Sequence, residues 1–232
     1  MQQNQSSQQN RHRVQIHGPQ INGILFDLDG TLLDSAPGIL NALFSILEKH
    51  GVPYNDQIDL NPFIGEGLMA LVTQCVPNLS QAQYQQYTQE GFAHYIKHAS
   101  TQTHAFPEAK AILSMLNQRK IPWGIVTNKT RALTQSVISA LPYYDTAKVL
   151  ICADDLEVKK PHPKPLLMAA EKLGTLPEHT LYLGDAINDM LAAKAANMIA
   201  VIAQYGYVPN NFKDWPHDGV VSTLLGLKKW LI

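Results

Sequence analysis

The chain has 232 residues, 45% of them hydrophobic, so it is long enough to bury one sizeable core and to carry a smaller insertion. Its 18 basic and 19 acidic residues nearly balance, which argues against a surface dedicated to nucleic acid or to anionic membranes. No apolar run approaches the ~20 residues of a membrane span. The two cysteines, Cys75 and Cys152, lie in apolar surroundings that are typical of buried free thiols. By elimination, we expect a cytoplasmic protein.

Residues 1–20 are rich in Gln, Asn and Ser and lack the apolar segment of a secretory signal, so we expect a flexible tail. After the tail, short apolar runs alternate with amphipathic stretches of helical period. This alternation predicts an α/β fold with a doubly wound parallel sheet and helices on both of its faces. The predicted strands are Ile21–Phe26, Trp123–Val126, Val149–Ile151, Leu181–Leu183 and Ile199–Ile202, and the predicted helices are Pro107–Arg119, Thr130–Leu141, Pro163–Leu173 and Ile187–Ala196.

Residues 36–104 interrupt this rhythm, because they contain helical patterns and no convincing strand. We expect them to form a helical cap inserted after the first strand, while residues 21–35 and 105–232 form the α/β core. Such a cap would exclude water from a reaction at the end of that strand, although an extra helical layer without a chemical role is the alternative. Asp34 and Ser35 precede the insertion and are expected to cap its first helix. The three helical patterns are Gly38–His50, Phe63–Val76 and Gln81–His98.

Polar side chains follow several predicted strands at the point where each strand ends. Asp27 and Asp29 stand two residues apart, so they project to the same side of the backbone, where their like charges call for a cation or a shared proton. The carboxyl ends of parallel strands meet at one edge of a sheet, which is where open α/β folds hold ligands. Carboxylates suit Mg²⁺, while Lys and Thr suit a phosphate. The other strand-end and loop residues of this set are Thr127, Asn128, Lys160, Asp185 and Asp189.

Other site types fail on spacing. A calcium loop of the EF-hand type beginning at Asp27 would need Gly and Glu where the chain has Leu32 and Gly38. The chain has no phosphate-binding loop motif, no dinucleotide fingerprint after a strand and no nucleophile elbow. His94 and His98 have helical spacing but lack further zinc ligands, so we interpret them as a packed or solvated helix face.

The order of these motifs resembles the haloacid dehalogenase superfamily of phosphatases. The resemblance rests on Asp27-Leu28-Asp29-Gly30-Thr31, then Thr127, then Lys160 before a proline, then Gly184-Asp185 with Asp189 following, and it covers about residues 21–230. The insertion resembles the cap of the phosphoglycolate phosphatase-like branch. The resemblance therefore implies an Mg²⁺-dependent phosphomonoester hydrolase.

The resemblance also implies a role for each matching residue. Asp27 would be the nucleophile that forms an aspartyl-phosphate, and Asp29 the general acid and base, with its backbone carbonyl on Mg²⁺. Thr127 and Asn128 would hold the transferring phosphoryl group, and Lys160 would offset charge between nucleophile and phosphate. Asp185 would be a direct Mg²⁺ ligand with Asp189 supporting the site.

These motifs define a reaction but not its substrate, because they act on the shared phosphate. Phosphoglycolate is the first expectation, and Asp34-Ser35-Ala36-Pro37 resembles phosphatases for it. Other segments, among them Tyr205-Gly206-Tyr207, resemble phosphatases for N-acetylmuramic acid 6-phosphate. A sugar-phosphate mutase, a general phosphatase and a non-catalytic binding module are the remaining alternatives. We expect a small-molecule partner, with neither nucleic acid nor membrane, and the sequence does not indicate an oligomeric state.

Overall fold

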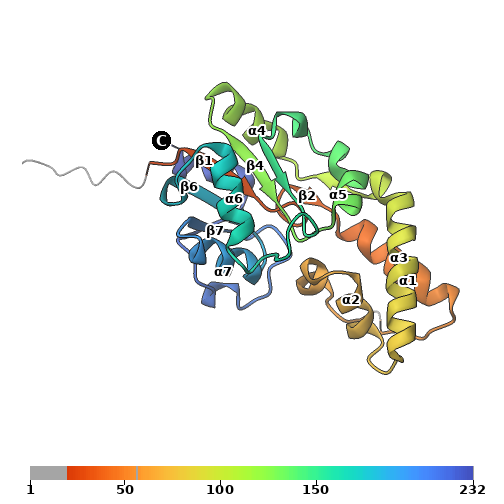
Figure 1. Ribbon diagram of the computed structural model, residues 1–232. Helices are drawn as coiled ribbons and strands as arrows, with labels where there is room; N and C mark the ends of the chain where they lie inside the picture. The colour runs from red at the N-terminus through yellow and green to blue at the C-terminus, as the bar shows by residue number, and fades with distance from the viewer. Residues whose placement is uncertain (1–19, 56, 232) are drawn as a thin grey trace, which may run out of the picture.

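A computed structural model describes residues 20–55 and 57–231, so the predicted tail over 1–20 lies outside the described residues except for Gln20. The molecule has an α/β core and a helical unit to one side of it (Figure 1). Within the described residues, no helix combines the length and the apolarity needed to cross a membrane. Cys75 and Cys152 are both buried and free, as predicted.

The core is built on a parallel six-stranded sheet in the order β5-β4-β1-β6-β7-β8. This arrangement confirms the predicted fold class. The strands predicted from the sequence all form, two with the predicted ends and three with ends that shift by at most two residues, and the edge strand β8 was not predicted. The strands are β1 (Gly23–Phe26), β4 (Trp123–Val126), β5 (Val149–Ile151), β6 (Thr180–Gly184), β7 (Ile199–Ala203) and β8 (Gly219–Val221).

Two hydrophobic layers cover the sheet because neighbouring residues of a strand point to opposite faces. Ile24 and Phe26 of β1 join one layer, while Leu25 between them joins the other. Helix α4 (Ala109–Gln118) packs on the first face, and α6 (Lys164–Leu173) and α7 (Ile187–Ala195) pack on the second. Helix α5 (Arg131–Val137) follows β4 and continues into a short 3₁₀ turn at Ile138–Ala140. Further 3₁₀ turns are Tyr144–Thr146, Pro177–His179, Phe212–Asp214 and Leu224–Trp230.

The chain leaves the core after β1 and returns to it through a two-stranded antiparallel ribbon. Its strands are β2 (Leu33–Asp34) and β3 (His104–Ala105), with Leu33 opposite Ala105. The segment between them forms three α-helices that share a hydrophobic cluster of their own. These are α1 (Ala36–Lys49), α2 (Leu68–Cys75), which follows a 3₁₀ turn at Asn61–Glu66, and α3 (Gln81–Gln102).

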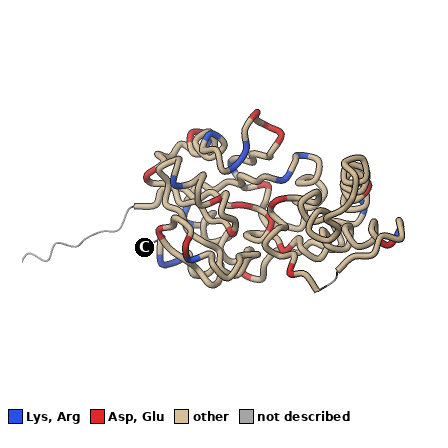
Figure 2. Tube along the Cα trace, turned by 90° about the horizontal axis from the view of Figure 1, so that it is seen from below, with Lys and Arg blue, Asp and Glu red and all other residues tan. Residues whose placement is uncertain are grey.

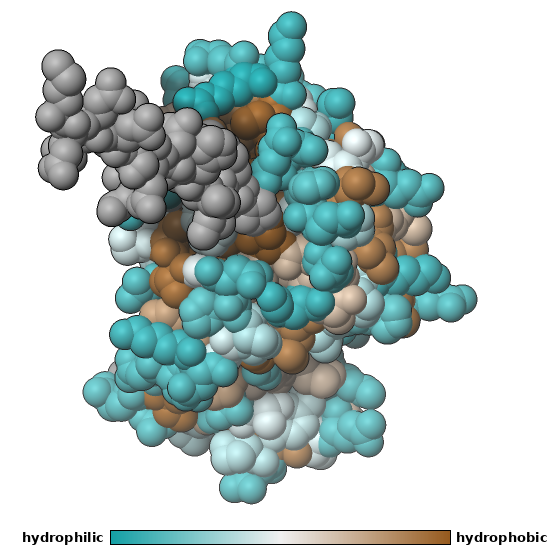
Figure 3. All heavy atoms as spheres, turned by 90° about the vertical axis from the view of Figure 1, so that its left-hand side faces the viewer, coloured by the Kyte–Doolittle hydropathy of each residue, from teal (hydrophilic) through white to brown (hydrophobic). Residues whose placement is uncertain are grey.

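The outer face of the core, on the side away from these helices, is mostly hydrophilic, with apolar residues in scattered patches (Figure 3). Acidic residues also lie along the middle of the molecule, between the core and the helical unit (Figure 2). The carboxyl end of β1 lies in that middle region, so the residues that follow this strand are the first candidates for a functional site.

Candidate active site

Asp27 and Asp29 follow β1 in a tight turn at the carboxyl edge of the sheet. The backbone N–H of Asp27 donates to Leu183 O at 2.9 Å, which keeps this residue in the register of the sheet. Gly30 has a φ of 74°, and a Cβ at this position would collide with the carboxylate of Asp185. The turn therefore requires glycine both for its left-handed backbone and for the space that the carboxylate occupies.

A buried lysine links the end of β1 to the helix after β6. Lys160 is 2% exposed, and its Nζ lies 2.8 Å from Asp27 Oδ1 and 2.7 Å from Asp189 Oδ1. The ammonium also donates to Val126 O at 2.9 Å and to the Tyr182 hydroxyl at 2.8 Å. Burial alone would lower the pKa of Lys160, but the two carboxylates reverse this effect and raise it, so the side chain carries a fixed positive charge.

Three carboxylates converge beside this lysine. Asp27, Asp185 and Asp189 each offer an oxygen, and these oxygens lie within 4.8 Å of one another. Burial, with repulsion from Asp189 added, raises the pKa of Asp27 to about 7 in spite of Lys160, and burial likewise raises the pKa of Asp185. The side-chain oxygen Asp27 Oδ1 is buried and accepts no hydrogen bond of good geometry, although it is ion-paired with Lys160.

This cluster fits a divalent cation. Its donors are carboxylate oxygens, the ligands that Mg²⁺ prefers, and a cation would relieve their mutual repulsion. Asp185 is held in place from two sides, because Thr31 Oγ1 donates to its Oδ1 at 3.1 Å and the backbone N–H of Tyr207 donates to its Oδ2 at 2.9 Å. The carboxylate of Asp29 lies outside the cluster, so the predicted contact of Asp29 with the ion depends on its backbone carbonyl and stays a prediction.

Thr127 and Asn128 lie where β4 ends, next to Lys160. Thr127 is buried, and its hydroxyl accepts a hydrogen bond from Lys129 N at 3.1 Å, so it stabilises the turn after the strand and does not cap a helix. The side-chain amide of Asn128 donates to Lys160 O at 2.9 Å and accepts from Lys160 N at 3.1 Å. These two bonds fix the main chain of the lysine, and they leave the backbone N–H of Asn128 and the second N–H of its side-chain amide for a phosphate.

Sequence reasoning missed the role of Lys129, the residue after this pair. Its Nζ lies 3.0 Å from Asp29 Oδ1 and 3.1 Å from Asp29 Oδ2, and it is also placed 4.6 Å from the centre of the Tyr95 ring on α3. Burial would lower the pKa of Lys129, but Asp29 and Tyr95 reverse this effect and raise it. The sequence does place Lys129 at a strand end, in the run Thr127-Asn128-Lys129. Its partner Asp29 is 100 residues away in sequence, so the ion pair itself could not be predicted.

The expectation that Ser35 caps α1 is wrong. Ser35 occupies the N-cap position, yet its hydroxyl donates to Asp29 Oδ1, and no side-chain cap bond forms. The hydroxyl of Tyr207 caps the helix instead, because it accepts hydrogen bonds from Ser35 N at 2.8 Å and from Ala36 N at 2.9 Å. The same hydroxyl donates to Asp34 Oδ1 at 2.8 Å. Tyr207 thus connects the start of α1 to the carboxylate of Asp185, which its own backbone N–H contacts.

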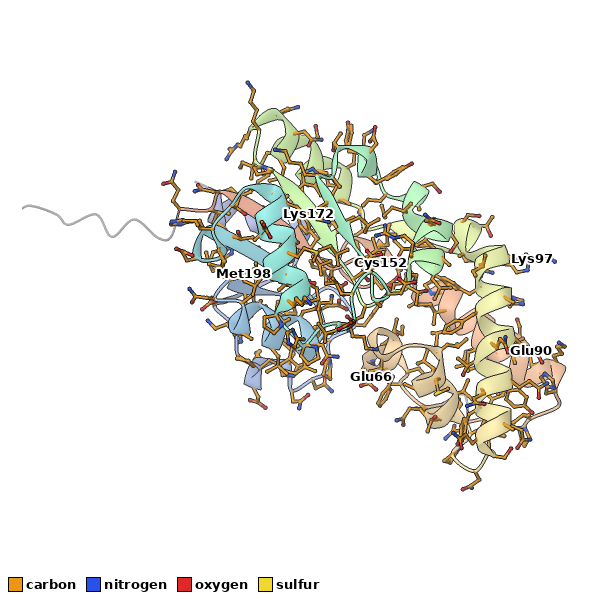
Figure 4. All side chains as sticks on the ribbon, viewed as in Figure 1. Glu66, Glu90, Lys97, Cys152, Lys172 and Met198 are labelled. Atoms are coloured by element: carbon orange, nitrogen blue, oxygen red, sulfur yellow. The ribbon has the colours of Figure 1, made fainter. Side chains whose placement is uncertain are left out.

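A cavity of about 240 Å³ opens above these residues, between the core and the helical unit. Its core side includes Asp27, Asp29, Thr127 and Lys129. The 3₁₀ turn before α2 approaches the core closely, since a Cβ on Gly65 would lie 3.8 Å from the Cβ of Ala186. Glu66 lies on the part of the unit that faces the core (Figure 4). The side chains that the helical unit adds to the cavity wall are mostly apolar, namely Ile39, Ala42, Ile64, Leu68, Phe92 and Tyr95.

The parallel sheet and this acidic, lysine-bearing edge define the class of protein. The chain belongs to the haloacid dehalogenase-like hydrolase family, whose model matches residues 24–203. The crystal structure of a protein from Bacteroides fragilis, assigned to the haloacid dehalogenase-like hydrolases, has a TM-score of 0.77 and 29% identity, and the match covers 88% of this chain and 98% of that one.

Two relatives that are named as phosphatases place the chain more closely within this family. A phosphoglycolate phosphatase of Xanthomonas campestris pv. campestris is 38% identical over 184 residues, which cover 79% of this chain and 83% of the relative. An N-acetylmuramic acid 6-phosphate phosphatase of Pseudomonas aeruginosa is 28% identical over 205 residues, or 87% of this chain and 91% of the relative. The chain is a phosphatase, as predicted, and not a non-catalytic binding module.

Proposed function

We propose that the protein hydrolyses small phosphomonoesters with Mg²⁺, through an aspartyl-phosphate on Asp27. The observation that supports this proposal best is the buried Lys160, whose Nζ lies 2.8 Å from Oδ1 of Asp27, a residue that lines the cavity. A carboxylate that attacks a phosphate dianion meets strong repulsion, so it needs fixed positive charge beside it. A buried lysine supplies that charge without reorganisation.

In the first half of the reaction, an oxygen of Asp27 forms a bond to phosphorus while the bond between phosphorus and the leaving oxygen breaks. Asp29 gives its proton to the leaving oxygen, which departs as an alcohol. Thr127 and the backbone N–H of Asn128 hold the phosphoryl oxygens, and Lys160 offsets their charge. In the second half, water attacks the phosphorus of the aspartyl-phosphate, Asp29 takes the proton of that water, and inorganic phosphate leaves with Asp27 restored.

Asp27 and Asp185, with the backbone carbonyl of Asp29, would hold the Mg²⁺ ion, and Asp189 would support them through Lys160. When bound, the ion supplies positive charge for the transferring phosphoryl group. Asp185 is pre-positioned for this task, because Thr31 and the backbone of Tyr207 fix both of its oxygens.

We also propose that residues 36–104 act as a cap that excludes water and contacts the leaving group. Supporting this role, the apolar side chains of Ile64 and Leu68 line the cavity opposite Asp27 and Asp29. Water excluded by such a wall strengthens each electrostatic contact on the core side. We retain the cytoplasm as the expected location.

For the physiological substrate we propose 2-phosphoglycolate. The support is the Xanthomonas campestris relative of that name, at 38% identity over most of both chains. N-acetylmuramic acid 6-phosphate is the second candidate, favoured by the Pseudomonas aeruginosa relative and by the apolar wall of the cavity, on which a sugar ring would pack.

The reaction is tested with p-nitrophenyl phosphate, whose release of p-nitrophenol we expect to require Mg²⁺ and to stop in EDTA. Asp27→Asn should remove turnover while circular dichroism shows an intact fold. Asp145→Asn, the same change at an exposed aspartate far along the chain, is the matched control and should keep full activity. Substantial turnover by Asp27→Asn would move the nucleophile elsewhere.

The substrate is tested by comparing kcat/KM for 2-phosphoglycolate and N-acetylmuramic acid 6-phosphate. A tenfold preference, about 1.4 kcal/mol of transition-state binding, decides between them. Equal values across many phosphates would indicate a general phosphatase. Return of the phosphoryl group to another hydroxyl of the substrate would indicate a mutase.

A further inference from the structure

Lys129 stands between the core and the cap. It follows β4, and its Nζ reaches both oxygens of Asp29 at 3.0 and 3.1 Å. From the cap, the ring of Tyr95 on α3 lies 4.6 Å from the same Nζ. The side chain is 6% exposed and lines the cavity. Burying the charge of a lysine costs free energy unless the charge has partners. Solvation therefore does not explain the position of Lys129, and its contacts need a functional or structural explanation.

Two buried lysines beside Asp27 and Asp29 have different neighbours. Lys160 contacts Asp27 and Asp189, on the side where the phosphoryl group would be held. Lys129 contacts Asp29 and faces the cap, on the side where the leaving group would lie. Lys159 also lines the cavity, but it is exposed to solvent. The two buried cations therefore contact different aspartates, Lys160 the proposed nucleophile and Lys129 the proposed acid and base.

A second negative charge on the substrate needs a cation on the leaving-group side. The cap wall is mainly apolar, and side chains such as Ile64, Leu68 and Phe92 offer a carboxylate neither charge nor a hydrogen bond. Of its polar side chains, Glu66 carries a negative charge and Tyr95 offers a hydroxyl without a positive charge. The carboxyl group of Asp29 supplies no positive charge either. An ammonium has three donors, so Lys129 is able to keep its contact with Asp29 while it binds another carboxylate.

We propose that Lys129 binds the carboxylate of the substrate's leaving group and thereby determines the specificity of the enzyme for acidic phosphomonoesters. This inference rests on the proposed function, since it takes the phosphoryl group to lie at Asp27 and Lys160. In 2-phosphoglycolate the carboxylate carbon is two bonds from the leaving oxygen. Asp29 is the proposed proton donor to that oxygen, so the ammonium of Lys129, which contacts Asp29, is within reach of the substrate carboxylate as well.

The test compares two substrates that differ in this group alone: 2-phosphoglycolate and 2-hydroxyethyl phosphate, in which a neutral hydroxymethyl group replaces the carboxylate. The wild-type enzyme should have the higher kcat/KM for 2-phosphoglycolate. Lys129→Met keeps the length of the side chain and removes its charge, and it should lower the ratio of the two kcat/KM values at least tenfold, chiefly through KM for 2-phosphoglycolate. Lys129→Arg should retain part of the preference.

Lys159→Met is the matched control, because it removes a charge from the exposed lysine of the same cavity, and it should leave the ratio unchanged. Turnover of p-nitrophenyl phosphate shows that each variant is folded. If Lys129→Met lowers kcat/KM for both substrates by the same factor, Lys129 only positions Asp29 and the inference is wrong. If the wild type hydrolyses p-nitrophenyl phosphate but has no preference between the two substrates, the phosphoglycolate proposal fails first and the inference fails with it.

Discussion

The hydroxyl of Tyr207 provides a quantitative test of how the cap is attached to the core. Tyr207→Phe removes an acceptor that serves two backbone N–H groups at the start of α1, those of Ser35 and Ala36. Both residues are nearly inaccessible, at 0% and 8% exposed, so water does not readily replace the lost oxygen. Each buried donor without a partner costs about 1–3 kcal/mol. We expect the variant to lose about 2–4 kcal/mol of its free energy of unfolding.

Urea denaturation followed by circular dichroism measures this loss. With a slope of about 2 kcal/mol per molar, the midpoint should fall by ~1–2 M. Tyr205→Phe is the matched control, because the hydroxyl of Tyr205 donates to Thr31 O alone, at 2.9 Å. A carbonyl that loses one of its partners costs less than two orphaned N–H groups, so this variant should lose about 1 kcal/mol.

Tyr207→Phe should also reduce activity. The start of α1 would no longer be fixed, and Ser35 at this position donates a hydrogen bond to Asp29. We expect kcat on p-nitrophenyl phosphate to fall about tenfold, which corresponds to ~1.4 kcal/mol in the barrier. If Tyr207→Phe is as stable as Tyr205→Phe, the start of α1 is satisfied by other groups, and the account of its attachment is refuted.

Three further predictions concern the metal, the turn after β1 and the pH dependence of stability. Mg²⁺ should raise the melting temperature of the wild type, and Asp185→Asn should remove most of that increase; an equal increase in the variant would place the ion elsewhere. Gly30→Ala should destabilise the protein by more than Gly51→Ala in urea denaturation, because both glycines have positive φ but only the Cβ at Gly30 meets another group. The pKa of Asp218 is lowered, since Lys194 and a backbone N–H outweigh the opposing effect of burial. Its contribution to stability is therefore present above its unfolded pKa, near 3.8, and is lost as the pH falls through the lower folded value; Asp218→Asn, followed by urea denaturation at several pH values, should lack this acid-dependent part.

Local patterns in the sequence predicted much of the fold. The continuous apolar run Ile24-Leu25-Phe26 predicts a buried strand, and in the structure its side chains enter two hydrophobic layers, one on each face of the sheet. The ribbon formed by β2 and β3 escaped prediction, because each strand has two residues and so shows no period. Its partners are also separated by the whole helical insertion.

The candidate site divides in the same way. Asp27, Lys160, Asp185 and Asp189 were expected to meet because each follows a strand or its loop, and the structure brings their side chains together. Their chemical roles stay predictions. Lys129 was not selected, since a lysine after a strand end has no visible partner until the fold brings Asp29 to it.

By itself, the sequence indicated a parallel sheet, the edge at which the polar residues gather and a set of side chains that suits Mg²⁺ and a phosphate. Those features depend on short-range periodicity and on residues placed at strand ends, and both are local properties. Only the tertiary structure decided that Tyr207 caps α1 across 171 residues of sequence, that Lys129 bridges Asp29 and Tyr95, and that the helical unit presents a mostly apolar wall to the cavity. These features arise from packing between distant segments, which no local pattern in the sequence shows.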